Sequence, residues 1–385
     1  MERDELAGWL RLGLAEGVGS EAARRLLAAF GLPAQVFAQS LDALAQVVSP
    51  AQARALHAVP SDRLAARLDA TWDWLRGADE RGAARAVVTL GDARYPGALL
   101  AADDPPVLLY LLGAPAFLER SASFAPPGRC LAVVGSRNPT AQGAANARAF
   151  AQALRSAGLT IVSGLALGVD GAAHEGALDA AVDDGQPATI AVVGTGLDRV
   201  YPRRHLALAR RIAQHGLVVS EYPLGTPPLA PNFPKRNRII AGLSQGTLVV
   251  EAALASGSLI TARLAAEQGR EVFAIPGSIH APQSRGCHAL IRQGAKLVES
   301  AQDVLEELHL PAPATAAAPP PPATAQDGSD DAVLQALGFD PAGLDALVAR
   351  TGIDAAALQV RLLELELSGE VARLPGGLFQ RVGQA

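Results

Sequence analysis

Residues 131–168 read LAVVGSRNPTAQGAANARAFAQALRSAGLTIVSGLALG, and this stretch decides the fold. The apolar run Leu131–Val134 predicts a buried strand, and Gly135 then opens a tight turn. The spacing of apolar residues over Ala141–Ala157 predicts a helix, and Thr160–Ser163 predicts the next strand. A strand, a helix and a second strand in this order are typical of a parallel sheet covered by helices.

The same alternation of short apolar runs and amphipathic helices continues in both directions along the chain. Further strands are predicted at Ala86–Leu90, Val107–Leu112, Thr189–Val193, Leu217–Ser220, Thr247–Glu251, Glu271–Ile275 and Lys296–Val298. Further helices are predicted at Val169–Ala180, His205–His215, Ile260–Gln268 and His288–Gln293. Strands that are apolar throughout are buried on both faces, so we expect an α/β fold with a doubly wound parallel sheet. Such sheets bind ligands at the carboxyl ends of their strands, where the strand order switches.

Composition divides the chain into four segments. Residues 1–80 predict a small helical domain of the SAM or helix-hairpin-helix type, with helices at Glu5–Leu14, Ser20–Phe30, Leu41–Val47 and Ser61–Leu75. Residues 81–310 hold the sheet. Residues 311–330 are a Pro/Ala-rich linker, expected to be stiff and to span on the order of 50 Å when extended. Residues 331–385 predict a winged-helix-like domain, with helices at Asp331–Leu337, Leu344–Arg350 and Ala355–Leu367 and a hairpin of Val371–Leu374 and Leu378–Val382.

The composition is that of a globular protein without a general basic excess. The formal charge is −5, so any contact with nucleic acid must come from a local patch. The two cysteines, Cys130 and Cys287, lie in no CxxC pattern, and neither a metal site nor a disulfide is expected. No apolar run is long enough to span a bilayer, and the acidic N-terminus contains no secretory segment. We therefore expect a cytoplasmic protein that does not contact a membrane.

Two glycine turns that follow predicted strands could bind an anion. Gly135, Ser136 and Arg137 precede a helix start, whose free N–H groups and partial positive charge suit a phosphate. Gly164, in the stretch Ser-Gly-Leu-Ala, repeats this design after the next strand. The alternative interpretation is structural, with Gly135 closing a strand-to-helix turn and Thr140 capping the helix.

The most informative stretch is residues 232–242, which read NFPKRNRIIAG. Three cations lie within four residues beside a phenylalanine, a combination that provides charge for phosphates and a ring on which a base can stack. Residues 199–238 as a whole contain eight Lys and Arg residues and a single acid, Glu221, for a local charge of +7. The alternative is an ordinary solvated charged face. The candidate binding residues here are Phe233, Lys235, Arg236, Asn237 and Arg238.

The next strand and helix supply two further candidates. Ser258 is expected to cap a helix or to line the same cleft. Glu251 could serve a nucleotide-processing hydrolase on a related core, which is the alternative function, but Ser244-Gln245-Gly246-Thr247 replaces the Pro-Gly-Gly-x-Gly-Thr loop of such enzymes. There is no Gly-x-Ser-x-Gly elbow and no P-loop, and Arg199 stands where a dinucleotide fingerprint needs its third glycine. No enzyme activity, catalytic residue, cofactor or metal is therefore expected.

Taken in order, these stretches closely resemble the DNA-processing protein A family, also called DprA or Smf, over about residues 86–300. The Phe-Pro-x-Arg-Asn-Arg-Ile-Ile-Ala-Gly string is highly specific. The other matching motifs are Val134-Gly135-Ser136-Arg137, Ser163-Gly164-Leu165-Ala166 with Gly168-Val169-Asp170, Gly194-Thr195-Gly196-Leu197-Asp198 with Tyr201-Pro202, Ser220-Glu221-Tyr222-Pro223, Gly257-Ser258-Leu259-Ile260-Thr261-Ala262 and Ile275-Pro276-Gly277.

The resemblance implies an extended Rossmann core that forms a homodimer, binds single-stranded DNA without ATP and loads RecA onto that strand in natural transformation. It also implies a binding pocket lined by the Gly-Ser-Arg turn and an Arg-Asn-Arg loop. Carried over to this chain, the pocket residues are Ser136, Arg137, Phe233, Arg236 and Arg238, with Lys235 adjacent. His205 and His288 depart from the family pattern, which has asparagine at both positions.

The net charge of the segment after the linker predicts which kind of molecule this segment contacts. From Asp331 onward there are seven acids and four arginines, for a local charge of −3. A winged helix that inserts into a DNA duplex should be basic. We therefore expect a module that contacts protein, and a duplex-binding regulator acting through this segment is the less favoured alternative.

Overall fold

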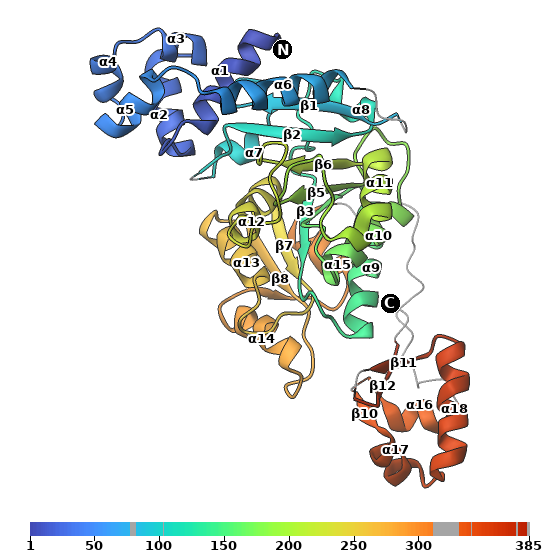
Figure 1. Ribbon diagram of the computed structural model, residues 1–385. Coiled ribbons are helices and arrows are strands. Elements are labelled where there is room, and N and C mark those ends of the chain that lie inside the picture. The colour runs from blue at the N-terminus through green and yellow to red at the C-terminus, as the bar shows by residue number, and fades with distance from the viewer. Residues whose placement is uncertain (78–81, 103, 311–330, 340, 375, 383–385) are drawn as a thin grey trace.

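The computed structural model describes residues 1–77, 82–102, 104–310, 331–339, 341–374 and 376–382. Its centre is a nine-stranded sheet in the order β1-β2-β6-β5-β4-β3-β7-β8-β9 (Figure 1). The strands are Ala84–Thr89 (β1), Leu108–Gly113 (β2), Cys130–Val134 (β3), Thr160–Ser163 (β4), Thr189–Val193 (β5), Leu217–Ser220 (β6), Gly246–Val249 (β7), Glu271–Ala274 (β8) and Lys296–Leu297 (β9). From β6 to β9 every neighbouring pair is parallel, which confirms the predicted doubly wound α/β fold.

The first two strands differ from the prediction of a wholly parallel sheet. β1 pairs antiparallel with β2, and β2 pairs antiparallel with β6. A parallel return needs a crossover connection, which is usually a helix that covers the sheet. Among the described residues between β1 and β2, the short helix α7 (Gly97–Leu100) is too short to serve as such a crossover, and a second short helix, α8 (Pro115–Leu118), follows β2. The expectation of parallel pairing is therefore wrong for this edge of the sheet.

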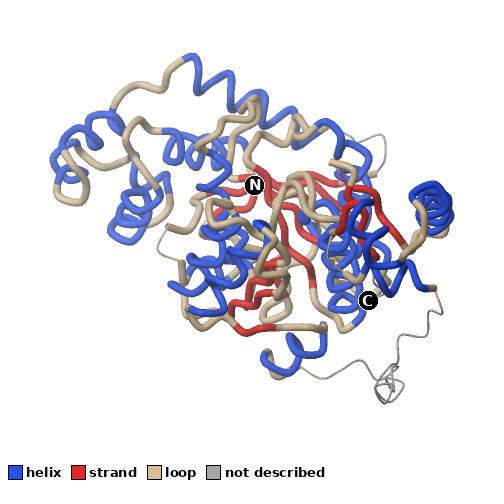
Figure 2. Tube along the Cα trace, turned by 90° about the horizontal axis from the view of Figure 1, so that it is seen from below, coloured by secondary structure: helices blue, strands red, loops and turns tan. Residues whose placement is uncertain are grey.

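Helices cover both faces of the sheet (Figures 1 and 2). One face carries α9 (Ala141–Ser156), α10 (Val169–Asp179), α11 (Leu206–His215) and α15 (Ala301–Glu307), and the other carries α12 (Asn232–Leu243), α13 (Ser258–Glu267) and α14 (Arg285–Arg292). Two 3-10 turns, η1 (Arg203–His205) and η2 (Pro282–Ser284), precede α11 and α14. Leu131 and Val133 pack under α9, while Ala132 and Val134 point to the α12 side. This alternation along β3 buries both faces of one strand.

The N-terminal segment contains six described helices, two more than its apolar spacing predicts. They are α1 (Arg3–Leu14), α2 (Ser20–Phe30), α3 (Pro33–Phe37), α4 (Leu41–Ala45), α5 (Pro50–His57) and α6 (Asp62–Arg76). The unpredicted helices α3 and α5 each begin with proline at their first position, where its missing N–H has no intrahelical partner to lose. Trp9 and Leu26 belong to a core shared with the β2 side of the sheet.

The C-terminal segment has its own small core and the predicted three helices and hairpin. Its elements are α16 (Ala332–Leu337), β10 (Ala342–Gly343), α17 (Leu344–Thr351), α18 (Ala355–Leu367), β11 (Val371–Leu374) and β12 (Leu378–Arg381), with strand order β10-β12-β11. Leu347, Leu358 and Leu362 are fully buried within it. The predicted linker, residues 311–330, lies outside the described residues. None of the helices in the described part of the chain is long and apolar enough to cross a membrane.

Candidate nucleic-acid interface

A pocket of about 440 Å³ lies where the strand order of the sheet reverses. The chain runs from β3 to β4, β5 and β6 in one direction, and continues from β7 to β9 on the other side of β3. The pocket is lined by the segments that follow β3 and β7, by Ala166 after β4, and by one side of α12. This is the topological switch point, where α/β sheets bind their ligands.

Close packing and hydrogen bonds fix the turn after β3. Gly135 has no room for a side chain, because an added Cβ would lie 2.8 Å from Val169 Cγ2 and 2.9 Å from the Glu251 carbonyl oxygen. Thr140 caps α9, as predicted, by accepting a hydrogen bond from the Gly143 N–H (2.9 Å). The N–H and hydroxyl of Thr140 donate to the two oxygens of the Glu251 carboxylate at 2.9 and 2.6 Å. Glu251 therefore ties the start of α9 to the end of β7 and does not line the pocket.

The turn after β4 encloses two buried groups of opposite charge, Asp170 and Arg236, which influence each other without a direct ion pair. Asp170 accepts hydrogen bonds from the Gly164 N–H (3.1 Å) and the Ala166 N–H (3.2 Å). Arg236 is only 4% exposed, and its guanidinium donates to the Val192 carbonyl oxygen. A Cβ on Gly164 would lie 2.0 Å from Arg236 Nη1, so glycine is required for the guanidinium to fit beneath this turn.

Burial shifts the pKa of both Asp170 and Arg236. Burial raises the pKa of Asp170, an effect that the positive charge of Arg236 opposes. Burial also lowers the pKa of Arg236 to about 10, an effect that the negative charge of Asp170 opposes and the positive charge of Arg137 reinforces. At neutral pH the guanidinium is still protonated, so Arg236 supplies positive charge to the pocket from beneath its surface.

An exposed cation and an aromatic ring lie at the mouth of the pocket. The guanidinium carbon of Arg137 is 5.9 Å from the centroid of the Phe233 ring. Arg137 is exposed and has no hydrogen bond or ion pair among the described residues. The Phe233 ring lies against Gly194, where an added Cβ would come within 3.1 Å. Tyr201, 48% exposed, extends this surface with its ring centroid 5.6 Å from that of Phe233.

The third wall is formed by the beginning of α13. Ser256, Gly257 and Ser258 line the pocket, and the hydroxyls of the two serines lie 2.7 Å apart. Asn237 Nδ2 donates to the Gly257 carbonyl oxygen (3.3 Å), which joins α12 to this wall. The prediction that Ser258 is the N-cap is wrong, because Gly257 holds that position and Ser258 is the first helical residue. Lining the cleft, the other role expected for Ser258, agrees with its position.

The cations predicted to cluster lie on different faces of one helix. Residues 232–243 form α12, not the loop that the resemblance implies, so side chains three or four positions apart share a face. Phe233, Arg236 and Asn237 face the pocket. Lys235 instead lines a crevice against the N-terminal helices, and Arg238 forms ion pairs with Glu221 (2.5 Å) and Asp104 (3.2 Å). The expectation that Lys235 and Arg238 converge with Arg236 is therefore wrong.

The structure thus brings together seven of the ten predicted site residues as pocket lining, with Gly164 packed against one of them, Arg236. Those that line the pocket are Gly135, Ser136, Arg137, Phe233, Arg236, Asn237 and Ser258. Tyr201 and Asp170 also belong to the site, although neither was expected there from the sequence. Tyr201 lies 32 positions before Phe233, and no local pattern indicates that the two rings meet. In the described ranges no group of three or more His, Cys, Asp or Glu residues could hold a metal ion.

Two family models match this chain, one over the region of the large sheet and one over the C-terminal segment. The model of the family described as DNA recombination-mediator protein A matches residues 86–309, and the DprA winged helix domain matches residues 315–377. Protein Smf of Escherichia coli is 46% identical over 289 residues, which is 74% of this chain and 74% of that protein. DNA processing protein DprA of Streptococcus pneumoniae is 50% identical over 216 residues, covering 56% of this chain and 72% of the relative. The X-ray structure of DNA processing protein A from Streptococcus pneumoniae superposes with a TM-score of 0.63 at 37% identity, over 80% of this chain and 98% of that chain.

Proposed function

Because this chain belongs to the DNA recombination-mediator protein A family, we propose that it binds single-stranded DNA in the pocket between β3, β4, β7 and α12. The observation that carries the proposal is the group at the pocket mouth. Arg137 is exposed, forms no hydrogen bond or ion pair among the described residues, and has its guanidinium carbon 5.9 Å from the ring centroid of Phe233, which pairs with Tyr201. A guanidinium that can hold a phosphate beside rings that can stack a base is what binding of a single strand requires.

The form of the pocket favours a single strand over a duplex. Its second cation, Arg236, is buried beneath the Gly164 turn, so a ligand must enter the pocket to approach it. A flexible single strand can insert one nucleotide into such a space, whereas the bases of a duplex are paired and stacked. Contacts to phosphates and ring faces carry little base preference, so we expect binding that tolerates any sequence.

We further propose that the protein is a recombination mediator that acts as a homodimer in the cytoplasm and loads RecA onto incoming DNA in natural transformation. These finer statements are supported by the family relationship. We propose no enzymatic activity for the hydrolase candidate Glu251, because both of its carboxylate oxygens accept hydrogen bonds from Thr140. We also infer that the chain comprises an N-terminal helical region (residues 1–80) that shares a core with the sheet-containing region (81–310), a linker sequence (311–330) and a winged-helix-like unit (331–385).

For the C-terminal unit we propose protein contact in place of DNA contact. On α18, Val360, Leu363 and Leu367 are 61, 55 and 82% exposed, with spacings of three and four that put them on one helical face. The nearby Arg361 is already engaged by Asp331 and Glu364. An exposed apolar stripe of this kind on an acidic unit suits a protein partner better than a phosphate backbone.

The test is a fluorescence anisotropy titration of labelled oligo-dT and of a duplex of equal length, repeated over a range of salt concentrations. We expect the single strand to bind more tightly and with a steep salt dependence. Arg137→Ala should weaken binding and reduce the slope of log K against log salt by about 0.7, the contribution of one phosphate contact.

Arg263→Ala is the matched control. Arg263 is an exposed arginine of α13 that pairs only with Glu267, one turn away, and it does not line the pocket. Equal losses in Arg137→Ala and Arg263→Ala, or a preference for duplex, would reject the proposed site.

A further inference from the structure

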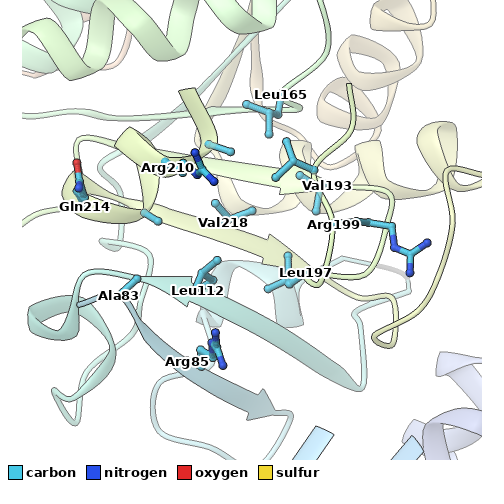
Figure 3. A pocket seen from close by; sticks show the side chains of 13 residues that line it. Ala83, Arg85, Leu112, Leu165, Val193, Leu197, Arg199, Arg210, Gln214 and Val218 are labelled. Atoms are coloured by element: carbon cyan, nitrogen blue, oxygen red, sulfur yellow. The ribbon is translucent and has the colours of Figure 1, made fainter. Parts of the chain in front are cut away.

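A second cavity, separate from the proposed DNA site, lies over the outer strands on the α11 face of the sheet (Figure 3). Its volume is about 410 Å³. α11 forms one side and β1 and β2 form the other, and the floor consists of aliphatic side chains. The floor residues are Leu112, Leu165, Val193, Leu197 and Val218. We refer to this cavity as the α11 groove.

Three arginines and a glutamine surround this aliphatic floor: Arg85, Arg199, Arg210 and Gln214. Arg210 is exposed and forms no hydrogen bond or ion pair within the described ranges. Arg85 donates from Nη1 to the carbonyl oxygens of Trp74 (2.9 Å) and Gly77 (3.2 Å) and forms no ion pair among the described residues, so its positive charge is not neutralised. Of the three, Arg199 alone is neutralised, by Asp198 at 2.6 Å. The α11 groove therefore has positive charge and donors available for an acidic ligand.

The lining of the α11 groove differs in kind from that of the DNA site. None of its lining residues is aromatic, so a nucleobase would find no ring on which to stack. The two cavities are separated by the turn after β4, where Leu165 faces the α11 groove and Ala166 faces the DNA pocket. Leu165 has φ +58°, a left-handed conformation that is uncommon for a residue other than glycine.

We propose that the α11 groove binds an acidic peptide segment of a partner protein, with aliphatic side chains of the segment on the floor and its carboxylates on the arginines. Charge complementarity favours this occupant. Arginine forks bind carboxylates in a bidentate manner, and aliphatic walls select aliphatic side chains over bases. Of the eight cations between residues 199 and 238, Arg199 and Arg210 line the α11 groove, and Arg85 adds a third from β1.

The experiment titrates the full-length chain into a short fluorescein-labelled peptide of alternating aspartate and leucine, followed by anisotropy. An alternating lysine and leucine peptide of the same length is the reference and should not bind. Arg210→Glu should weaken binding of the acidic peptide about tenfold or more, since it replaces an attractive charge with a repulsive one. The matched control is Arg204→Glu in η1, directly before the same helix; Arg204 is likewise exposed and without an ion pair among the described residues, it lies outside the α11 groove, and this variant should bind as the unaltered chain does.

Several results would overturn the proposal. Unchanged peptide affinity in Arg210→Glu would remove the α11 groove as the binding site. Competition by oligo-dT for the peptide would assign the groove to the path of the DNA strand. Self-association in sedimentation that Arg210→Glu abolishes would make a second copy of the chain the occupant. Tighter peptide binding in Leu363→Ser with Leu367→Ser would make the acidic C-terminal unit of the chain itself the occupant.

Discussion

Replacing Arg236 with alanine should cost stability as well as DNA affinity, because this cation is part of the interior. The side chain is 4% exposed, lies beneath the Gly164 turn and donates to the Val192 carbonyl oxygen. Asp170, 8% exposed, would lose the compensating positive charge of Arg236, and the Val192 carbonyl would lose its donor. Leaving a buried polar group unsatisfied costs about 1–3 kcal/mol. For a domain of this size that corresponds to a fall in Tm of roughly 2–12 °C.

The loss should also depend on pH in a definite direction. Burial raises the pKa of Asp170 in the folded protein, and removal of Arg236 raises it further. A carboxyl group whose folded pKa lies above its unfolded value stabilises the fold at low pH, and this contribution disappears as the pH rises through the folded pKa. The difference in Tm between Arg236→Ala and the unaltered chain should therefore be smaller at pH 5 than at pH 8.

Differential scanning calorimetry at both pH values measures this effect. The double variant Arg236→Met with Asp170→Leu removes both charges and should recover most of the lost stability. Arg137→Ala, which removes an exposed cation of the same pocket, should leave Tm unchanged. The reasoning is refuted if Arg236→Ala unfolds at the same temperature as the unaltered chain at both pH values, or if the double variant is less stable than Arg236→Ala.

Three further outcomes are expected. Tyr201→Ala should weaken oligo-dT binding roughly 5- to 150-fold, the loss of stacking on one base, without changing Tm; a titration with unchanged affinity would place the strand elsewhere. Gly164→Ala should destabilise the protein by about 1–3 kcal/mol in urea unfolding, because the new Cβ would lie 2.0 Å from Arg236 Nη1, and a neutral result would mean that the guanidinium can move aside freely. Thr140→Val should cost about 1–2 kcal/mol by the same measurement, through loss of the α9 cap and of the 2.6 Å hydrogen bond to Glu251.

Much of the core could be predicted from local patterns. An apolar run such as Leu131–Val134 is typical of a strand that is buried on both faces. The amphipathic spacing over residues 141–157 is typical of a helix that packs on one face of a sheet. The Gly135 turn was predictable for a similar reason, since a glycine between a buried strand and a helix start marks a place without room for a side chain. The antiparallel edge was not predictable in this way, because an apolar strand has the same sequence pattern in either pairing direction.

Within the candidate site, the kinds of residue present can be read from the sequence, but which of them act together depends on how the domain folds. The cations at positions 235, 236 and 238 look equivalent in the sequence. In α12 the helical rotation of about 100° per residue turns Arg236 under the pocket, Lys235 toward the N-terminal helices and Arg238 onto Glu221. Tyr201 reaches Phe233 only because β5 and β6 lie side by side, so the segments that follow them emerge at the same sheet edge. A sequence records composition and local periodicity, whereas convergence of distant side chains depends on strand order and helix rotation, which only packing of the whole domain sets.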